Sequence, residues 1–219
     1  MEQTVMSEGL AARPVVFVVD DDPSVRTSLK ELLESVGLRV ELFDSVDAFI
    51  ASRLPDVASC LVLDVRLPGR SGLEFQTELT KAGTPLPIIF ITGHGDIPMS
   101  VRAMKSGAVE FLTKPFRDQD LLEAVRAAIE RDRARRQEEN SIAALKTRFA
   151  SLTAREKEVI GYVSAGFMNK QIATEIGCSE VTVKVHRRNI MQKMSARSLA
   201  ELVRMADLLG VGRAVSKPH

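Results

Sequence analysis

The strongest constraint on the fold is an alternation of two hydrophobic patterns across residues 14–129. Short apolar runs rich in branched residues are typical of buried parallel strands. They are Val15–Val19, Arg39–Phe43, Cys60–Leu63, Pro87–Ile91 and Val109–Leu112. Helix-like stretches follow each run: Ser24–Val36, Ser45–Arg53, Gly72–Ala82, Pro98–Ser106 and Asp118–Ile129. This alternation predicts an α/β doubly wound domain, with five parallel strands covered by helices on both faces.

The remainder of the chain lacks strand-like runs. Residues 130–150 carry mixed charges without Gly or Pro, which fits either an exposed extension of the fifth helix or a semi-rigid linker. From Leu152 to Leu209 the pattern is helical only, in short segments. We therefore expect a first domain at 14–129, a charged helical linker at 130–150 and an all-α domain at 151–212.

Charge separates the two halves as clearly as periodicity does. The 219 residues have a net charge of only +1. Residues 1–129, however, contain 13 basic and 19 acidic side chains, whereas residues 130–219 contain 17 basic and 10 acidic ones. An acidic first half and a basic second half predict that only the second half contacts nucleic acid.

Several classes of protein are excluded by composition. Two distant cysteines, Cys60 and Cys178, cannot build a disulfide scaffold and match no zinc pattern. No apolar run approaches the roughly 20 residues of a membrane span. Residues 1–13 lack the apolar core of a signal peptide. We therefore expect a soluble, cytoplasmic protein without a membrane partner.

Polar side chains follow four of the five predicted strands. Asp20 and Asp21 follow the first strand, Asp64 the third, Thr92 the fourth and Lys114 the fifth. Ligands bind at the carboxyl ends of the strands in open sheets of this kind. Carboxylates from two strands would repel each other there, and a hard cation such as Mg²⁺ relieves that repulsion. The pattern predicts a magnesium and anion site.

Such a site permits attack by the Asp64 carboxylate on a phosphoryl group, which forms an acyl phosphate. Mg²⁺ and Lys114 would neutralise the phosphoryl oxygens, and Thr92 would donate a hydrogen bond to them. Taken alone, an Asp run before a helix also fits simple N-terminal capping, which is our interpretation of Asp22. The coincidence of these residue types at one sheet edge favours the phosphoryl site.

The second half predicts a helix-turn-helix. Thr153 and Glu156 have the spacing of a capping box at the start of a helix. Asn169–Ile176 is a short helical segment, and a Gly177-Cys178 turn separates it from a helix that Ser179 caps and that runs to about Met194. Two helices joined by a glycine-containing turn are typical of this DNA-binding motif.

The helix after Ser179 has two distinct faces. At about 100° per residue, Val183, Ile190 and Met194 share one stripe, whereas Lys184 and Arg188 lie nearly opposite with two valines, Val181 and Val185. In the DNA major groove, such cations would contact guanine edges or phosphates, and a valine would contact a thymine methyl. A coiled-coil or protein-docking helix is the alternative.

Residues 14–129 resemble the receiver domain of two-component response regulators. The matching segments are Val18–Asp21, Leu61–Pro68, Ile89–Pro98 and Phe111–Phe116. The resemblance implies a flavodoxin-like sheet with strand order 2-1-3-4-5.

It also implies roles for individual residues. Asp64 would be the phosphoacceptor, and Asp21 and Asp64 would bind Mg²⁺ with the Arg66 backbone carbonyl, Asp20 acting mainly through water. Thr92 and Lys114 would contact the phosphoryl oxygens. Phe111 occupies the position of the switch aromatic, which is often Tyr. The neighbouring His94 is expected to have no essential chemistry, and Met99–Ser106 with Val109–Phe111 are candidates for a dimer surface.

Residues 152–209 resemble the four-helix LuxR-type DNA-binding domain. The motif runs from Leu152–Val159 through Asn169–Ala173 to Val181–Ile190, with Met194 where Leu is usual. The resemblance implies a dimer face on the last helix, Ser198–Leu209, and two sets of DNA contacts. Base readers would be Lys184, Val185 and Arg188, and phosphate contacts would be Asn169, Lys170 and Thr182.

Together the two resemblances imply a transcription regulator of the FixJ/NarL class, not an enzyme beyond slow self-phosphorylation and dephosphorylation. Its expected partners are a cognate sensor histidine kinase, double-stranded promoter DNA and a second copy of the chain on activation, with RNA polymerase as a further candidate. One alternative is a receiver that signals by protein docking without phosphorylation. The other is an aspartyl-phosphate phosphohydrolase, although Arg66 occupies the position where such enzymes usually carry a general acid.

Overall fold

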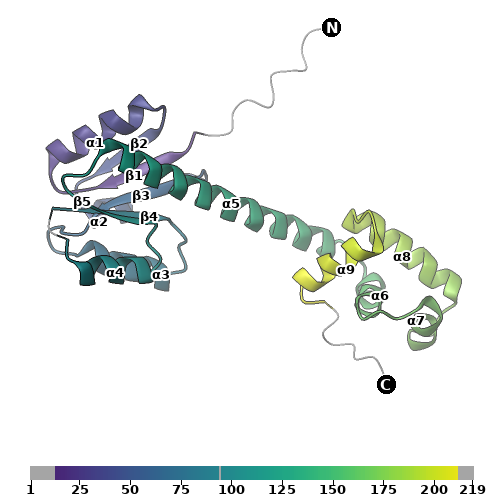
Figure 1. Cartoon of the computed structure of the whole chain (residues 1–219). Helices are drawn as coiled ribbons and strands as arrows, with labels where there is room; N and C mark the ends of the chain where they lie inside the picture. The colour runs from purple at the N-terminus through teal and green to yellow at the C-terminus, as the bar shows by residue number, and fades with distance from the viewer. Residues whose placement is uncertain (1–12, 94, 212–219) are drawn as a thin grey trace, which may run out of the picture. The chain divides into compact units, whose positions relative to one another are not determined.

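A computed structural model of the chain describes residues 13–93 and 95–211 (Figure 1). Position 94, to which the expectation about His94 refers, lies outside the described residues, as do residues 1–12. The chain divides into two compact units between Arg136 and Gln137.

The first unit is a five-stranded sheet with helices on both faces. Its strands are β1 (Val15–Val19), β2 (Arg39–Phe43), β3 (Ser59–Asp64), β4 (Ile88–Thr92) and β5 (Glu110–Thr113). Its helices are α1 (Pro23–Ser35), α2 (Val46–Ala51), α3 (Gly72–Lys81), α4 (Ile97–Lys105) and the first part of α5 (Asp118–Ala150). The predicted fold class is confirmed.

All neighbouring strands are parallel, in the order β2-β1-β3-β4-β5. The register places Val15 opposite Ser59 and Leu61 opposite Ile88. The chain adds β2 on one side of β1 and then crosses to the other side of β1 to add β3, β4 and β5. In such folds, ligands bind in the crevice at the carboxyl ends of the two strands where this change of side occurs, here β1 and β3.

Side chains alternate between the two faces of each strand, and this alternation builds two cores. Phe17 and Leu63 face one side, where they pack with residues of α2, α3 and α4 such as Phe49. Val18 and Val62 face the other side and pack with residues of α1 and α5. Burial on both faces explains why β1 is apolar throughout and β3 is apolar from Cys60 to Leu63.

Three predicted strands, β3, β4 and β5, end one residue later than expected. Asp64 and Thr92 were expected just after their strands, but they are the last residues of β3 and β4. Their backbones therefore remain in the sheet, with Asp64 opposite Ile91 and Thr92 opposite Thr113. The ladder holds both residues more rigidly than a loop would, because neighbouring strands fix their positions.

Helix α5 continues without interruption through residues 130–150, so the extension of the fifth helix is the alternative that the structure adopts. Its buried side chains Leu121, Val125 and Ala128 pack on the sheet. The packing continues beyond residue 129, since the compact unit ends at Arg136.

The second unit contains the end of α5 and four further helices: α6 (Ala154–Ser164), α7 (Asn169–Glu175), α8 (Glu180–Met194) and α9 (Leu199–Leu208). Its core joins Leu145 and Leu152 to Ile160, Ile172 and Ile190. The predicted caps are present, since Thr153 and Glu156 form a capping box and the Thr182 backbone N–H donates to the Ser179 hydroxyl. None of the helices in the described ranges is long and apolar enough to cross a membrane.

Candidate functional site

Three aspartates follow the end of β1. Asp20 is fully buried, and its Oδ1 accepts a hydrogen bond from the Asp22 backbone N–H at 2.9 Å. Asp21 is exposed. Asp22 caps α1, because its carboxylate accepts a hydrogen bond from the Ser24 backbone N–H at 2.8 Å. The local interpretation of Asp22 is thus confirmed.

Lys114, which follows β5, joins the ends of β1 and β3. Its Nζ lies 2.6 Å from Asp20 Oδ2 and 2.8 Å from Asp64 Oδ2. Asp64 is buried, and its Oδ1 accepts a hydrogen bond from the Arg66 backbone N–H at 2.9 Å. One cation therefore holds two carboxylates from neighbouring strands in one pocket.

The charges in this pocket perturb one another. Burial raises the pKa of Asp20, although hydrogen bonds from Lys114 and from the Asp22 backbone oppose the rise. Burial alone would lower the pKa of Lys114, but its hydrogen bonds to Asp20 and Asp64 outweigh that effect and raise it. Lys114 therefore stays protonated at neutral pH and can neutralise an anion beside Asp64.

The acidic residues present a set of oxygen ligands suited to a hard cation. Asp20, Asp21 and Asp64 each offer a carboxylate oxygen, and these oxygens all lie within 4.8 Å of one another. Lys114 supplies one positive charge against three carboxylates. Mg²⁺ binds through one or two carboxylates and several waters, so the donor set fits a divalent cation.

Sequence reasoning missed two residues that support this pocket. Arg26 of α1 donates from Nη1 to the Asp20 backbone carbonyl at 2.6 Å. Gly72, the first residue of α3, lies so close to β3 that a Cβ there would be 2.5 Å from the Asp64 carbonyl oxygen. The only sequence signal for Gly72 was its place at a predicted helix start, since its proximity to Asp64 depends on the packing of α3.

The predicted switch residues Thr92 and Phe111 lie on adjacent strands. Thr92 is fully buried. Phe111 is half-buried, with its ring centroid 6.3 Å from that of Phe90. Gly95 lies close to both residues: a Cβ there would lie 2.9 Å from Phe111 Cε1 and 3.2 Å from Thr92 Cγ2. The loop after β4 thus contacts both residues, a further relationship that sequence reasoning missed.

The two faces of α8 are arranged as its sequence predicts. Val183, Ile190 and Met194 are completely buried in the second core. Lys184 and Arg188 are exposed, and so are Val181 and Val185, at 69% and 44%. An exposed helix face that carries both cations and valines can present charge and methyl groups to the major groove.

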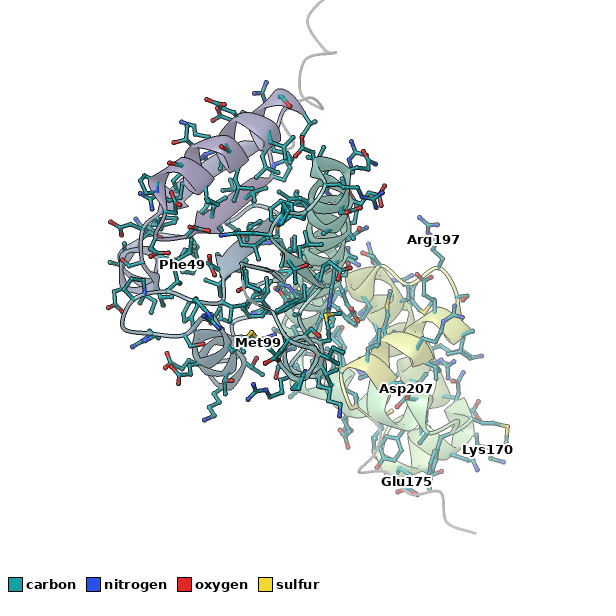
Figure 2. All side chains as sticks on the ribbon, turned by 60° about the vertical axis from the view of Figure 1, so that its left-hand side comes forward. Phe49, Met99, Lys170, Glu175, Arg197 and Asp207 are labelled. Carbon is teal, nitrogen blue, oxygen red and sulfur yellow. The ribbon has the colours of Figure 1, made fainter. Side chains whose placement is uncertain are left out.

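The predicted phosphate contacts lie on two helices. Asn169 is the first residue of α7 and is half-buried, whereas Lys170 beside it is exposed. Figure 2 shows Lys170 and Glu175 at the periphery of the second unit. Thr182 is exposed in the first turn of α8, and its hydroxyl lies 2.9 Å from that of Ser179, so it takes part in the cap as well.

A partly buried ion pair holds the other end of α8. Glu156 is 3% exposed and accepts hydrogen bonds from Lys193 Nζ at 2.7 Å and from the Thr153 backbone N–H at 2.8 Å. Burial alone would raise the pKa of Glu156, but these hydrogen bonds outweigh burial and lower it. The first turn of α6 is thereby tied to the last turn of α8.

Comparison with protein families gives one match in each unit. Residues 16–126 match the response regulator receiver domain. Residues 150–206 match the luxR family of bacterial regulatory proteins.

Individual relatives match nearly the whole chain. Nodulation protein W of Bradyrhizobium diazoefficiens is 58% identical over 201 residues, which cover 92% of this chain and 88% of that protein. Transcriptional regulatory protein FixJ of Azorhizobium caulinodans is 47% identical over 199 residues, covering 91% and 94% of the two chains. Among solved structures, the response regulator StyR is 54% identical with a TM-score of 0.81, covering 90% of this chain and 99% of that one. Full-length FixJ from B. japonicum is 42% identical with a TM-score of 0.53, covering 90% and 97%.

Proposed function

The chain belongs to the transcriptional response regulators that join a receiver domain to a LuxR-type DNA-binding domain, and from this premise we propose that phosphorylation of Asp64 controls its binding to promoter DNA. The phosphoryl donor is a sensor histidine kinase. The expected setting is the cytoplasm, where such a kinase domain and the promoter are both accessible.

One observation carries the proposal: Lys114 Nζ lies within 2.8 Å of both Asp20 and Asp64, beside a third carboxylate, Asp21. A structural ion pair would need one carboxylate for one lysine. Three carboxylates at a sheet edge instead leave negative charge to be matched by a ligand. This excess supports a site that binds a cation together with an anion.

Asp21 and Asp64 would hold Mg²⁺, with the Arg66 carbonyl as a further ligand and Asp20 acting mainly through water. When bound, the cation supplies positive charge to the oxygens of a transferring phosphoryl group. Asp64 Oδ attacks phosphorus while the bond from phosphorus to the donor histidine nitrogen breaks, so the phosphoryl group becomes an acyl phosphate. Lys114 and Thr92 then contact the new phosphoryl oxygens.

The phosphoryl group adds charge and acceptor oxygens at Asp64. Thr92 moves toward them and vacates space, and Phe111 turns into it. The surface formed by α4, β5 and α5 rearranges, which favours dimerisation through Met99–Ser106 and Val109–Phe111. Exposed apolar side chains on α4, such as Ile97 and Val101, support a role for this surface in association.

A dimer would place two copies of α8 on two half-sites related by a two-fold axis. Lys184, Val185 and Arg188 would contact bases. The phosphate contacts would be made by Asn169, Lys170 and Thr182. RNA polymerase is then a candidate partner at the promoter.

Acetyl phosphate with Mg²⁺ tests the proposal without the kinase. Intact-mass measurement should show one phosphoryl group on the wild type and on Asp22→Asn, which alters only the capping residue. Asp64→Asn should take up none. No uptake by the wild type, or equal uptake by Asp64→Asn, would overturn the proposal. The first result would favour a docking receiver, and steady turnover of small phosphomonoesters would favour a phosphohydrolase.

A further inference from the structure

Another buried carboxylate lies far along the chain from the phosphoryl site. Asp132 of α5 is 1% exposed. It continues the buried seam formed by Leu121, Val125 and Ala128, whose spacing of four and three residues keeps them on one helix face. The last residue on the side of α5 that packs on the sheet is thus the acidic Asp132. None of the proposed phosphoryl chemistry uses it.

Asp132 has hydrogen-bond partners on both sides. Its Oδ2 accepts a hydrogen bond from the Ser59 backbone N–H at 3.0 Å. Arg136 Nε donates to the same oxygen at 2.8 Å, and Arg135 Nη2 donates to Oδ1 at 2.6 Å. Arg136 also binds Asp56, with Nη1 2.5 Å from Oδ1. Asp132, Arg136, Ser59 and Asp56 together are here called the Asp132 clamp.

The clamp compensates for a difference in strand length. Leu61 lies opposite Ile88, the first residue of β4, and the Leu61 N–H donates to the Pro87 carbonyl. Ser59 lies two residues earlier, beyond the start of β4. Its N–H is therefore bound by the Asp132 carboxylate in place of a strand carbonyl. A helix side chain thus completes the ladder at the amino end of β3.

Burying an ionised carboxylate rarely increases stability over a well-packed apolar residue, because desolvation offsets the attraction between the charges. The hydrogen bonds of Asp132 are directional, however, so they fix the rotation of α5 about its own axis. A non-directional apolar contact would not fix this rotation. Immediately after Arg136, residues 137–141 are exposed, and the first compact unit ends. The clamp therefore lies in the last turn of α5 that belongs to the first compact unit.

We propose that Asp132 is a positioning residue that couples the phosphorylated receiver to DNA binding, by holding the final receiver-bound turn of α5 in one orientation. The proposal rests on the proposed function. Strand β3 carries Asp64 at its carboxyl end and Ser59 at its amino end, so one rigid strand joins the phosphoacceptor to the clamp. Without the clamp, α5 would leave the receiver in variable orientations. Phosphorylation of Asp64 would then have a smaller effect on the DNA affinity of the second unit.

The test compares DNA affinity of the full chain with and without beryllofluoride and Mg²⁺, a stable mimic of the acyl phosphate. The duplex is one selected from random sequence by the wild type. Asp132→Leu removes the clamp but keeps an apolar side chain on the buried seam, and Arg136→Gln is the milder second variant. Glu130→Gln is the matched control, because it removes an arginine partner, Arg133, on the exposed face of the same helix.

Allosteric couplings commonly change affinity by about 5–150-fold. We expect beryllofluoride to increase affinity within that range for the wild type and Glu130→Gln, and to have little effect on Asp132→Leu, with Arg136→Gln between them. Phosphoryl uptake and DNA affinity without beryllofluoride should be unchanged in all variants. Hydrogen exchange at the Ser59 amide should be faster in Asp132→Leu, as direct evidence that the clamp has opened.

Three outcomes would overturn the proposal, and they are distinguishable. If Ser59 exchanges faster but Asp132→Leu responds to beryllofluoride like the wild type, the clamp is only structural and the proposed function stands. If the wild type itself shows no response, both the proposed function and the coupling role fail. If Asp132→Leu does not fold, an unchanged response of Arg136→Gln overturns the coupling role.

Discussion

Lys114 lies 2.8 Å from the Asp64 carboxylate, although fifty residues and two strands separate them in the chain. The same ammonium group reaches Asp20 at 2.6 Å. Lys114 is therefore the cation around which the acidic edge of the sheet is organised.

Replacement of Lys114 by glutamine should slow phosphoryl uptake by Asp64. The variant loses the positive charge that stabilises the negative charge on the phosphoryl oxygens during transfer. Loss of one such stabilising group commonly lowers the reaction rate by about 10²–10³-fold. The initial rate of mass gain with acetyl phosphate measures the effect. Lys81→Gln, at the exposed end of α3, is the control and should react at the wild-type rate. Equal rates for the two variants would contradict the role of Lys114.

Mg²⁺ should stabilise the first unit through Asp21. A ligand at about 100 times its Kd stabilises a folded protein by about 2.7 kcal/mol. Thermal unfolding should therefore shift upward with Mg²⁺ in the wild type and shift little in Asp21→Asn. Asp22→Asn should retain the full shift, because asparagine still caps α1 and Asp22 is not a proposed ligand. A full shift in Asp21→Asn would exclude Asp21 as a ligand.

Gly95→Ala should displace the Phe111 ring. The new Cβ would lie 2.9 Å from both Phe111 Cε1 and Thr113 Cγ2, closer than a normal contact. Overpacking of this kind costs about 1–3 kcal/mol. Urea unfolding measures the loss, and sedimentation with beryllofluoride shows whether dimerisation also changes. Gly93→Ala is the matched control, since a Cβ there meets no atom within 4 Å. Equal stabilities would contradict tight packing at Gly95.

Glu156→Gln should destabilise the second unit in a pH-dependent way. The Lys193 pair contributes about 1.5–3 kcal/mol as a hydrogen bond to a charged group. Because the pKa of Glu156 is lowered by folding, its contribution is present above the unfolded pKa of about 4.3 and is lost as pH falls through the folded pKa. Calorimetry of the full chain should show a deficit at neutral pH that shrinks below about pH 4. A deficit independent of pH would argue against the charged pair.

Lys184 and Lys170 should affect DNA binding differently. Lys184→Ala should cost about 1–3 kcal/mol and relax sequence preference, as expected for a base contact. Lys170→Ala should weaken all duplexes similarly and reduce the salt dependence of binding by the equivalent of about one phosphate contact. Titrations at several salt concentrations distinguish the two. Lys146→Ala, an exposed cation on α5, should behave as the wild type. Identical profiles for Lys184→Ala and Lys170→Ala would show that both residues contact only phosphates.

A structural feature could be predicted from sequence when the residues that form it lie close together in the chain. The elements of the sheet were predictable because residues such as Val18 and Leu63 belong to short apolar runs whose pattern is local. The caps at Asp22, Thr153 and Ser179 were predictable for the same reason, since each bonds to a residue two or three positions away. The gathering of Asp20, Asp64 and Lys114 was predictable only after a parallel sheet had been assumed.

The amino-acid pattern alone thus specified a parallel α/β unit, a helical unit and the face that α8 buries, because periodicity and capping act within a few residues. Tertiary structure decided the contacts of Gly72 with Asp64 and of Gly95 with Phe111. It also placed Asp132 against Ser59, 73 residues away. Those relationships depend on strand order, on where β4 begins and on how α5 rotates against the sheet. Each of these results from packing between distant segments, for which neighbouring residues carry no signal.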